Sequence, residues 1–211
     1  MQNLDAMPPY LAEKMRYWSN LGHWIIGGML AIVGVLALLE ILGVLTGGWV
    51  YAWPGVLALA GLVLPLGILS HGDEKYGREL VLADPQHRQH LIMGGIIFLG
   101  GVAEIVALAA GIGFVRYAWP LALGAVGVIF LIHPQHGTDA AAVKAVRIHR
   151  ILGGTFILAG LARLIAVVTG AYSGLFGFAW IILVLVAAAQ LIFYREPEGA
   201  YEAGSHSEHG S

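Results

Sequence analysis

Six long apolar runs dominate the chain, and shorter polar segments separate them. Each run is continuous rather than alternating, which favours helices over strands, and each has a length within the range that a bilayer-spanning helix needs. The runs cover residues 21–46, 50–70, 89–112, 116–132, 148–169 and 174–194. The pattern therefore predicts an all-α integral membrane protein with six transmembrane helices.

A repeated motif divides these runs into three pairs. A His followed by three residues and two glycines occurs at His23, His90 and His149. About 30 residues after each His, an aromatic residue is followed by Ala-Trp, so the whole unit recurs. Because the turns within units are short and the connections between them are long, we expect three parallel-repeat helical hairpins. Their boundaries are residues 21–83, 84–138 and 139–195.

The two ends of the chain differ in character from the hairpins. Residues 1–20 predict a short N-terminal interfacial helix, with Ser19 or Asn20 capping the first spanning helix. Residues 196–211 are rich in Gly, Ser, Glu and His, which predicts a flexible tail.

Two polar connections carry the start signals of later helices. Asp84 before Pro85 marks the beginning of the third spanning helix, because Pro is favoured in a first turn. Thr138 or Asp139 is placed to cap a long fifth helix that begins outside the bilayer.

Basic residues are distributed unequally between the two sides of the predicted bundle. Of the eleven Lys and Arg, only Arg116 falls on the side of the short turns and only Arg163 falls inside the bilayer. The positive-inside rule then places both termini in the cytoplasm of a bacterial- or archaeal-type inner membrane. The opposite side is rich in aromatic residues, Trp53, Trp119 and Trp180 among them, which predicts an aromatic belt.

Alternation of the helices gathers seven histidines near the cytoplasmic face. Imidazoles bind copper, zinc and iron, and two of them can hold haem b. We expect a haem b or transition-metal (copper or zinc) site among these residues, although interfacial helix caps with no cofactor are an alternative. The cofactor candidates are His23, His71, His90, His133 and His149, and the metal-ligand candidates are His71, His87, His90, His133, His136 and His149.

Two details bear on that site. The repeated Gly-Gly pairs leave a flat helix surface that suits either a porphyrin or close packing of helices. The third unit has no His at the end of its second helix, where the first two units have His71 and His133. This inequality favours a specific site near His71, His90, His133 and His149.

Three charged residues fall within the predicted bilayer: Glu40, Glu104 and Arg163. Glu104 and Arg163 both lie fourteen residues after their repeat His, and are therefore at equal depth. Because an isolated charge there is costly, we expect an intramembrane Glu104–Arg163 ion pair, shared with Glu40. A proton or quinone site is the alternative.

Composition limits the remaining functions. A net charge of −2 gives no indication of a nucleic-acid partner, and the chain lacks a phosphate-binding Gly loop, an H-E-x-x-H motif and a Ser nucleophile elbow. We therefore expect no enzyme on its own, but an accessory or electron-transfer subunit of a larger membrane complex. A cofactor-free scaffold, and a copper-handling or small-solute transporter, are the alternatives.

The architecture is similar to that of two known groups. In size, helix number and His near helix ends, the chain resembles small membrane b-type cytochromes. In placing a His at a helix start ahead of small residues, it resembles copper-resistance membrane proteins. The likeness is one of architecture, and it assigns a role to no residue.

Overall fold

The computed structural model describes residues 9–70, 85–133 and 139–200, and these parts of the chain are helical with no strand. The six long helices are α1 (Pro9–Ile41), α2 (Ala52–Ser70), α4 (Pro85–Ala110), α5 (Ala118–Leu131), α6 (Asp139–Thr169) and α7 (Leu175–Ile192). Two short 3₁₀ turns, η2 (Gly47–Tyr51) and η3 (Gly113–Tyr117), precede α2 and α5. Six helical segments of the described chain are long and apolar enough to cross a membrane, as the hydrophobic pattern predicted.

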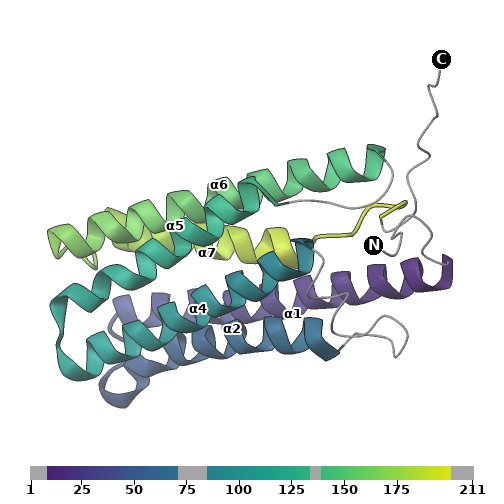
Figure 1. Cartoon of the computed structure of the whole chain (residues 1–211). Helices are drawn as coiled ribbons and strands as arrows, with labels where there is room; N and C mark the ends of the chain where they lie inside the picture. Colours follow the sequence, from purple (N-terminus) through teal and green to yellow (C-terminus); the bar gives the residue numbers. More distant parts are fainter. Residues whose placement is uncertain (1–8, 71–84, 134–138, 201–211) are drawn as a thin grey trace.

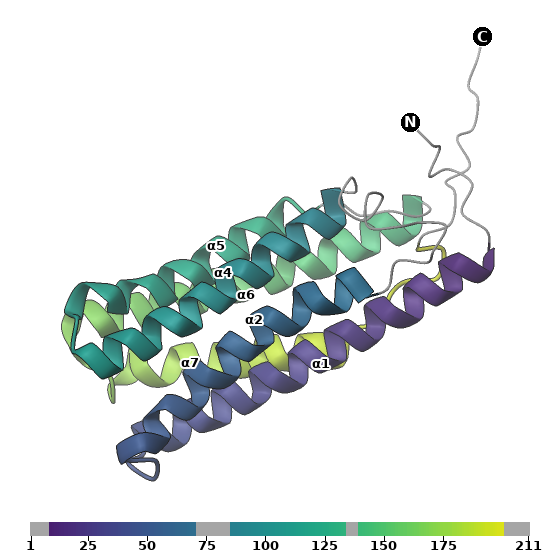
Figure 2. The ribbon, with the colours of Figure 1, turned by 60° about the horizontal axis from the view of Figure 1, so that its bottom comes forward.

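The helices form a single bundle in which chain neighbours run in opposite directions (Figure 1). Each helix contacts the next one along the chain, and α7 contacts α1, so the six helices form a closed ring (Figure 2). The short turns lie at one end of the bundle, and the start of α1 and the end of α7 lie at the other (Figure 1). One continuous apolar core fills the interior.

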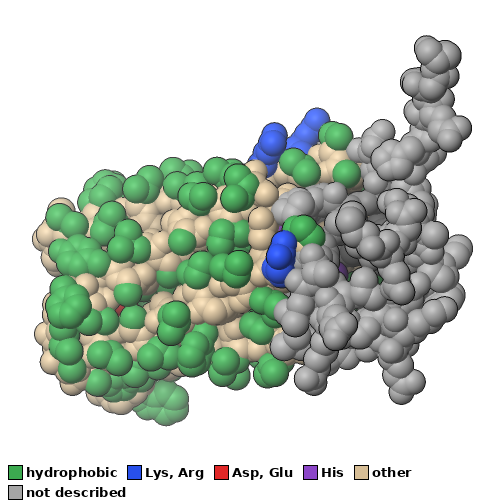
Figure 3. Space-filling view, in the orientation of Figure 1, with side chains coloured by type: hydrophobic (Ala, Val, Ile, Leu, Met, Phe, Trp, Pro, Cys, Tyr) green, Lys and Arg blue, Asp and Glu red, His purple; other side chains and the backbone are tan. Residues whose placement is uncertain are grey.

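The surface of the bundle is apolar over most of its length, and Lys and Arg side chains appear toward one end (Figure 3). Leu59, Leu99 and Leu121 are examples of apolar side chains on this surface, and each is more than half exposed. A soluble protein rarely exposes a contiguous apolar surface of this extent, whereas a lipid-facing surface is expected to be apolar.

The aromatic belt is only partly as predicted. Trp49 and Phe114, in the turns, are strongly exposed. Trp53, Trp119 and Trp180 are instead about 98–99% buried in the core, at the beginning of α2, α5 and α7. The repeated Trp is therefore a core residue of the helical bundle, and its assignment to the belt was wrong.

The N-terminal interfacial helix was also wrong as a separate element, because α1 runs without a break from Pro9 to Ile41. The polar residues that were expected to cap a new helix bind the far end of the chain instead. Ser19 Oγ donates a hydrogen bond to Glu196 Oε2, and the backbone N–H of Glu196 donates to Asn20 Oδ1. The helix starts at Pro85 and Asp139 agree with the predicted signals, while Asp84 and Thr138 lie outside the described residues.

The same contacts correct the prediction for the beginning of the tail. Glu196 and Ala200 are both more than 90% buried, so residues 196–200 pack on the bundle. The remaining residues of the predicted tail, 201–211, lie outside the described part of the chain.

The two glycines of each repeated pair have different surroundings. A Cβ on the first glycine would meet a neighbouring helix: Ile192 at Gly27, Pro65 at Gly94, and the Gly127 carbonyl oxygen at Gly153, the last at 2.7 Å. A Cβ on the second glycine of each pair would meet nothing within 4 Å. Close approach of helices thus explains the first glycine, as small residues do at membrane helix interfaces.

This difference gives a matched test of packing. Gly153→Ala is expected to lower the free energy of unfolding by about 1–3 kcal/mol, because its Cβ would press on backbone of α5. Gly154→Ala is expected to change it by less than about 1 kcal/mol, since that site is open and Ala favours helix. Thermal unfolding in detergent measures both. Equal losses would contradict the packing of α6 against α5.

Candidate functional site

Four histidine rings meet at the end of the bundle that holds the start of α1. They come from α1 (His23), α4 (His90), the residues after α5 (His133) and α6 (His149). Ring centroids are 4.6 Å apart for His90–His133, 5.1 Å for His133–His149, 6.0 Å for His23–His149 and 6.5 Å for His23–His90. We call these four residues the histidine cluster.

The three repeat histidines of the cluster share one local geometry. Nδ1 of each ring lies 2.7–2.8 Å from the backbone carbonyl oxygen four residues earlier: Ser19 for His23, Gln86 for His90 and Ala145 for His149. A carbonyl oxygen only accepts hydrogen bonds, so Nδ1 must be the donor. In the neutral imidazole this places the proton on Nδ1 and the lone pair on Nε2.

The fourth histidine is oriented by a side chain. His133 lies beyond the last residue of α5 and is 96% buried. Its Nδ1 is 2.7 Å from Oε1 of Gln89, on the neighbouring α4. An amide oxygen also accepts only, so His133 has the same proton placement as the other three.

This arrangement is the one that commonly supports a metal ligand. A histidine that binds a metal through one nitrogen usually donates its other N–H to a carbonyl or carboxylate, which fixes the ring and raises its basicity. All four rings of the histidine cluster have such a partner on Nδ1. In the neutral ring each Nε2 therefore carries the lone pair, and it is the atom through which the ring would bind a metal.

Tyr194 is part of the same site, and sequence reasoning missed it. Its ring centroid is 4.2 Å from that of His23 and 5.6 Å from that of His149. The sequence does hold a signal: Tyr194 lies fourteen residues after Trp180, and His133 lies fourteen after Trp119. The third sequence repeat therefore has a Tyr where the second has a His.

A buried carboxyl group stands next to the cluster. Ser19 Oγ donates to Glu196 Oε2 and lies 3.5 Å from His23 Nδ1, so one hydroxyl group separates the carboxyl from the ring. Burial raises the pKa of Glu196 above its ordinary value of 4.5, and hydrogen bonds from Ser19 and Tyr194 partly oppose that change. A bound cation nearby would instead favour the ionised carboxylate.

A test of this burial follows from the direction of the Glu196 pKa. Because the folded protein holds the proton more tightly than the unfolded chain, stability falls as pH rises from about 4.5 through the raised pKa. Glu196→Gln is expected to abolish this part of the pH dependence, so its stability advantage over the native protein grows across that window. Melting temperatures of metal-free protein against pH measure it. Parallel curves for the two proteins would contradict the burial of Glu196.

The spacing of the rings suits a small ion better than a macrocycle. Two imidazoles on one tetrahedral ion, each bound at about 2.0–2.1 Å, have ring centroids roughly 5 Å apart. The cluster distances of 4.6–6.5 Å bracket that value. The ring centroids of Phe130 and His149 are 5.7 Å apart, and the Tyr194 ring packs against that of His23. A haem between the histidines would require these aromatic rings to separate.

The histidine cluster is close to a coordination shell without having its geometry. Among the described residues, no group of three His, Cys, Asp or Glu side chains is arranged so that it could hold an ion. Metal binding therefore needs the rings to turn toward a common point.

The other three candidate metal ligands, His71, His87 and His136, are not part of the histidine cluster as described. His71 and His136 lie outside the described residues, and His87 is a half-buried residue of α4.

The predicted Glu104–Arg163 ion pair is present near the other end of the bundle. Arg163 Nη2 donates to Glu104 Oε1 at 2.6 Å, and both side chains are more than 90% buried. The Arg163 guanidinium also lies 5.0 Å from the ring centroid of Trp180 and 5.9 Å from that of Trp53. Glu40 joins indirectly, because its Oε2 accepts from Trp53 Nε1 rather than from Arg163.

The site has no assignment by similarity: no protein-family model, curated protein or solved structure matches the chain.

Proposed function

We propose that this chain is a multi-pass membrane protein of three hairpin repeats that holds a transition-metal ion in the histidine cluster. The six apolar helices and the apolar outer surface support the membrane assignment. The unequal distribution of Lys and Arg supports placing the cluster on the cytoplasmic side. The ion would then be bound at the cytoplasmic ends of the helices.

One observation carries the metal assignment: four imidazoles from four parts of the chain lie together, each with Nδ1 held by an oxygen atom. Without Cys in the sequence, the ligands are nitrogen and oxygen atoms, which suit copper, zinc, iron or nickel. Glu196 supplies a carboxyl group within one hydroxyl of the cluster and would balance part of the charge of the ion.

The placement of the polar groups favours a fixed site over a transport route. The histidine cluster and the Glu104–Arg163 pair lie near opposite ends of the bundle, and Met93, Ile97 and Phe156 belong to the apolar core of the same helices. A permeating ion would need ligands along the whole path. We therefore propose a metal-holding accessory subunit of a membrane complex, with haem binding as the second candidate.

Metal analysis of the purified protein tests this proposal. The protein is extracted in mild detergent, and its metals and absorption spectrum are measured before and after treatment with a chelator. We expect one transition-metal ion per chain, no Soret band, and rebinding of one equivalent of Zn²⁺ or Cu²⁺ by the stripped protein. A Soret band would favour haem instead, and the absence of both metal and rebinding would favour a cofactor-free scaffold.

A further inference from the structure

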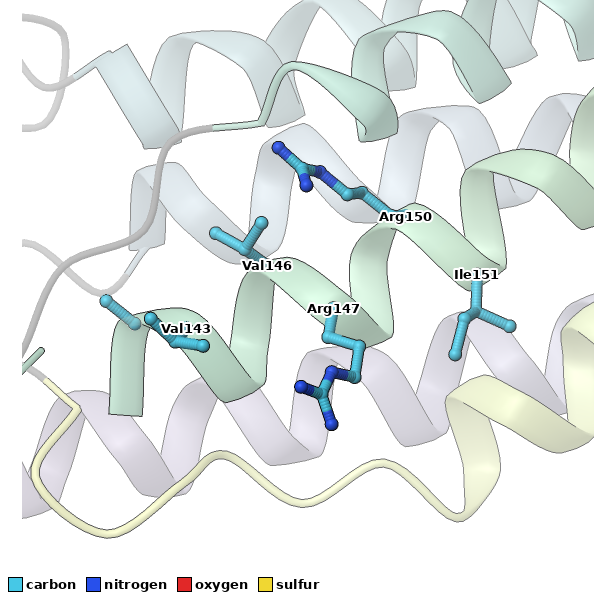
Figure 4. A pocket seen from close by; sticks show the side chains of 6 residues that line it. Val143, Val146, Arg147, Arg150 and Ile151 are labelled. Carbon is cyan, nitrogen blue, oxygen red and sulfur yellow. The ribbon is translucent and has the colours of Figure 1, made fainter. Parts of the chain in front are cut away.

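A second site is formed at the N-terminal part of α6. An open pocket of about 640 Å³ is lined there by Ala142, Val143, Val146, Arg147, Arg150 and Ile151. Figure 4 shows the side chains of Arg147 and Arg150 extending from α6 in different directions, with Val146 on the same stretch of the helix. Both arginines are exposed, as are Val143 and Ile151, so the pocket combines two cations with an apolar wall.

Neither arginine has a compensating partner in the described part of the chain. Arg163, by contrast, is paired with Glu104, and Arg195 donates to backbone carbonyl oxygens of residues 192 and 194. Arg147 and Arg150 make no hydrogen bond, ion pair or ring contact with any described residue. Arg147 and Arg150 are three residues apart on α6 and are therefore neighbours on its surface, so their long side chains can turn toward one anion, which both would stabilise.

The position of the pocket along α6, relative to a bilayer, indicates the source of that anion. The apolar span of α6, Ala140–Thr169, has 30 residues, which is about 45 Å of helix. The hydrocarbon core needs only about 20 residues, and counting back from Thr169 places Arg147 and Arg150 at its boundary. Phospholipid headgroups, which carry phosphates, occupy this level of a bilayer.

The surface of α6 beyond the pocket is suited to an acyl chain. Ile151, Leu158 and Ile165 follow one another at intervals of seven residues, so they lie along one face of the helix. Their side chains are 58%, 56% and 38% exposed. Gly154, on the same stretch, leaves open space beside it.

We infer that this pocket, with the apolar face below it, binds one anionic phospholipid, whose phosphate lies between Arg147 and Arg150. The inference rests on the proposed insertion in a membrane, and it is independent of the metal in the histidine cluster. Guanidinium groups recognise phosphate through paired hydrogen bonds, and basic pockets at the cytoplasmic side of membrane proteins bind anionic headgroups. The acyl chain would lie along Ile151, Leu158 and Ile165.

The test compares lipid binding by the intact protein and by matched variants, using native mass spectrometry in detergent. We expect the native protein to retain one phosphatidylglycerol and to prefer it to phosphatidylcholine. Arg147→Gln/Arg150→Gln is expected to bind it at least about tenfold more weakly, since two charged hydrogen-bonding groups are lost. Arg88→Gln, an exposed arginine of α4 outside the pocket, is expected to bind as the native protein does.

Three results would overturn the inference. They are undiminished binding by the double variant, an equal loss in Arg88→Gln, and displacement of the lipid by inorganic phosphate at equal concentration, which would indicate a free-anion site. Melting temperature in lipid-free detergent shows whether the double variant is folded. If it is not folded, Arg147→Lys/Arg150→Lys, which keeps both charges, replaces it in the comparison of lipid binding. Metal content measured on the same samples separates this inference from the proposed function, because it should be unchanged in the variants.

Discussion

Glu104→Gln is expected to lower the free energy of unfolding by about 3–5 kcal/mol, because it leaves the guanidinium of Arg163 buried without its counter-ion. An arginine stays charged in proteins, so it cannot escape this cost by losing its proton. Arg163→Gln is expected to cost less, since a carboxylic acid, unlike a guanidinium, exists in a neutral form. Denaturant or thermal unfolding in detergent measures the difference between the two variants.

The double variant shows whether the two residues act as a pair. Glu104→Gln/Arg163→Gln leaves no buried charge at this position, so its loss of stability is expected to be smaller than that of Glu104→Gln. Contacts of the guanidinium with Trp53 and Trp180 are lost in both variants that lack Arg163, so they cancel in the double-mutant cycle, although they add to the loss of the double variant relative to Glu104→Gln. A loss equal to the sum of the two single losses would show that the ion pair contributes no coupling energy.

His133→Ala is expected to weaken the binding of Zn²⁺ or Cu²⁺ by more than 100-fold, roughly, because it removes a ligand from the centre of the cluster. Gln89→Leu is expected to weaken it by about 10–100-fold, since it removes only the oxygen that orients the His133 ring. Competition titration against a chelator of known affinity gives both values. The graded effect is the signature of a ligand and of the residue that positions it.

The control for these variants is another imidazole, on α4, the helix that carries Gln89. His87→Ala removes a histidine of α4 that is outside the four-residue cluster, and is expected to leave metal affinity within about threefold of the native value. Melting temperatures of the metal-free variants show whether each is folded. Equal loss in His87→Ala and His133→Ala would contradict the assignment of the four ligands.

The sequence carried enough information for the helices and for the position of the histidines. Continuous apolar runs of membrane-spanning length left few other structures for the chain, and the repeat placed His23, His90 and His149 at equivalent positions of alternate helices. The depth of Glu104 and Arg163, counted from those histidines, was also sufficient to pair them.

The sequence did not show in the same way which face of each helix points toward the core. When both faces of a helix are apolar, hydropathy does not say which side chains point inward, so Trp53, Trp119 and Trp180 were taken for interfacial residues. Contacts between distant parts of the chain were equally hidden. Ser19 and Asn20 looked like helix caps because nothing local showed that Glu196, 177 and 176 residues away, would bind them.

X-ray absorption at the edge of the bound metal tests the proposal that the histidine cluster binds a transition metal through imidazole nitrogens. We expect two to four nitrogen neighbours at about 2.0–2.1 Å with the multiple scattering typical of imidazole, and we expect His133→Ala to reduce their number. A purified protein that takes up no metal, or a metal surrounded by oxygen atoms and unaffected by His133→Ala, would contradict it.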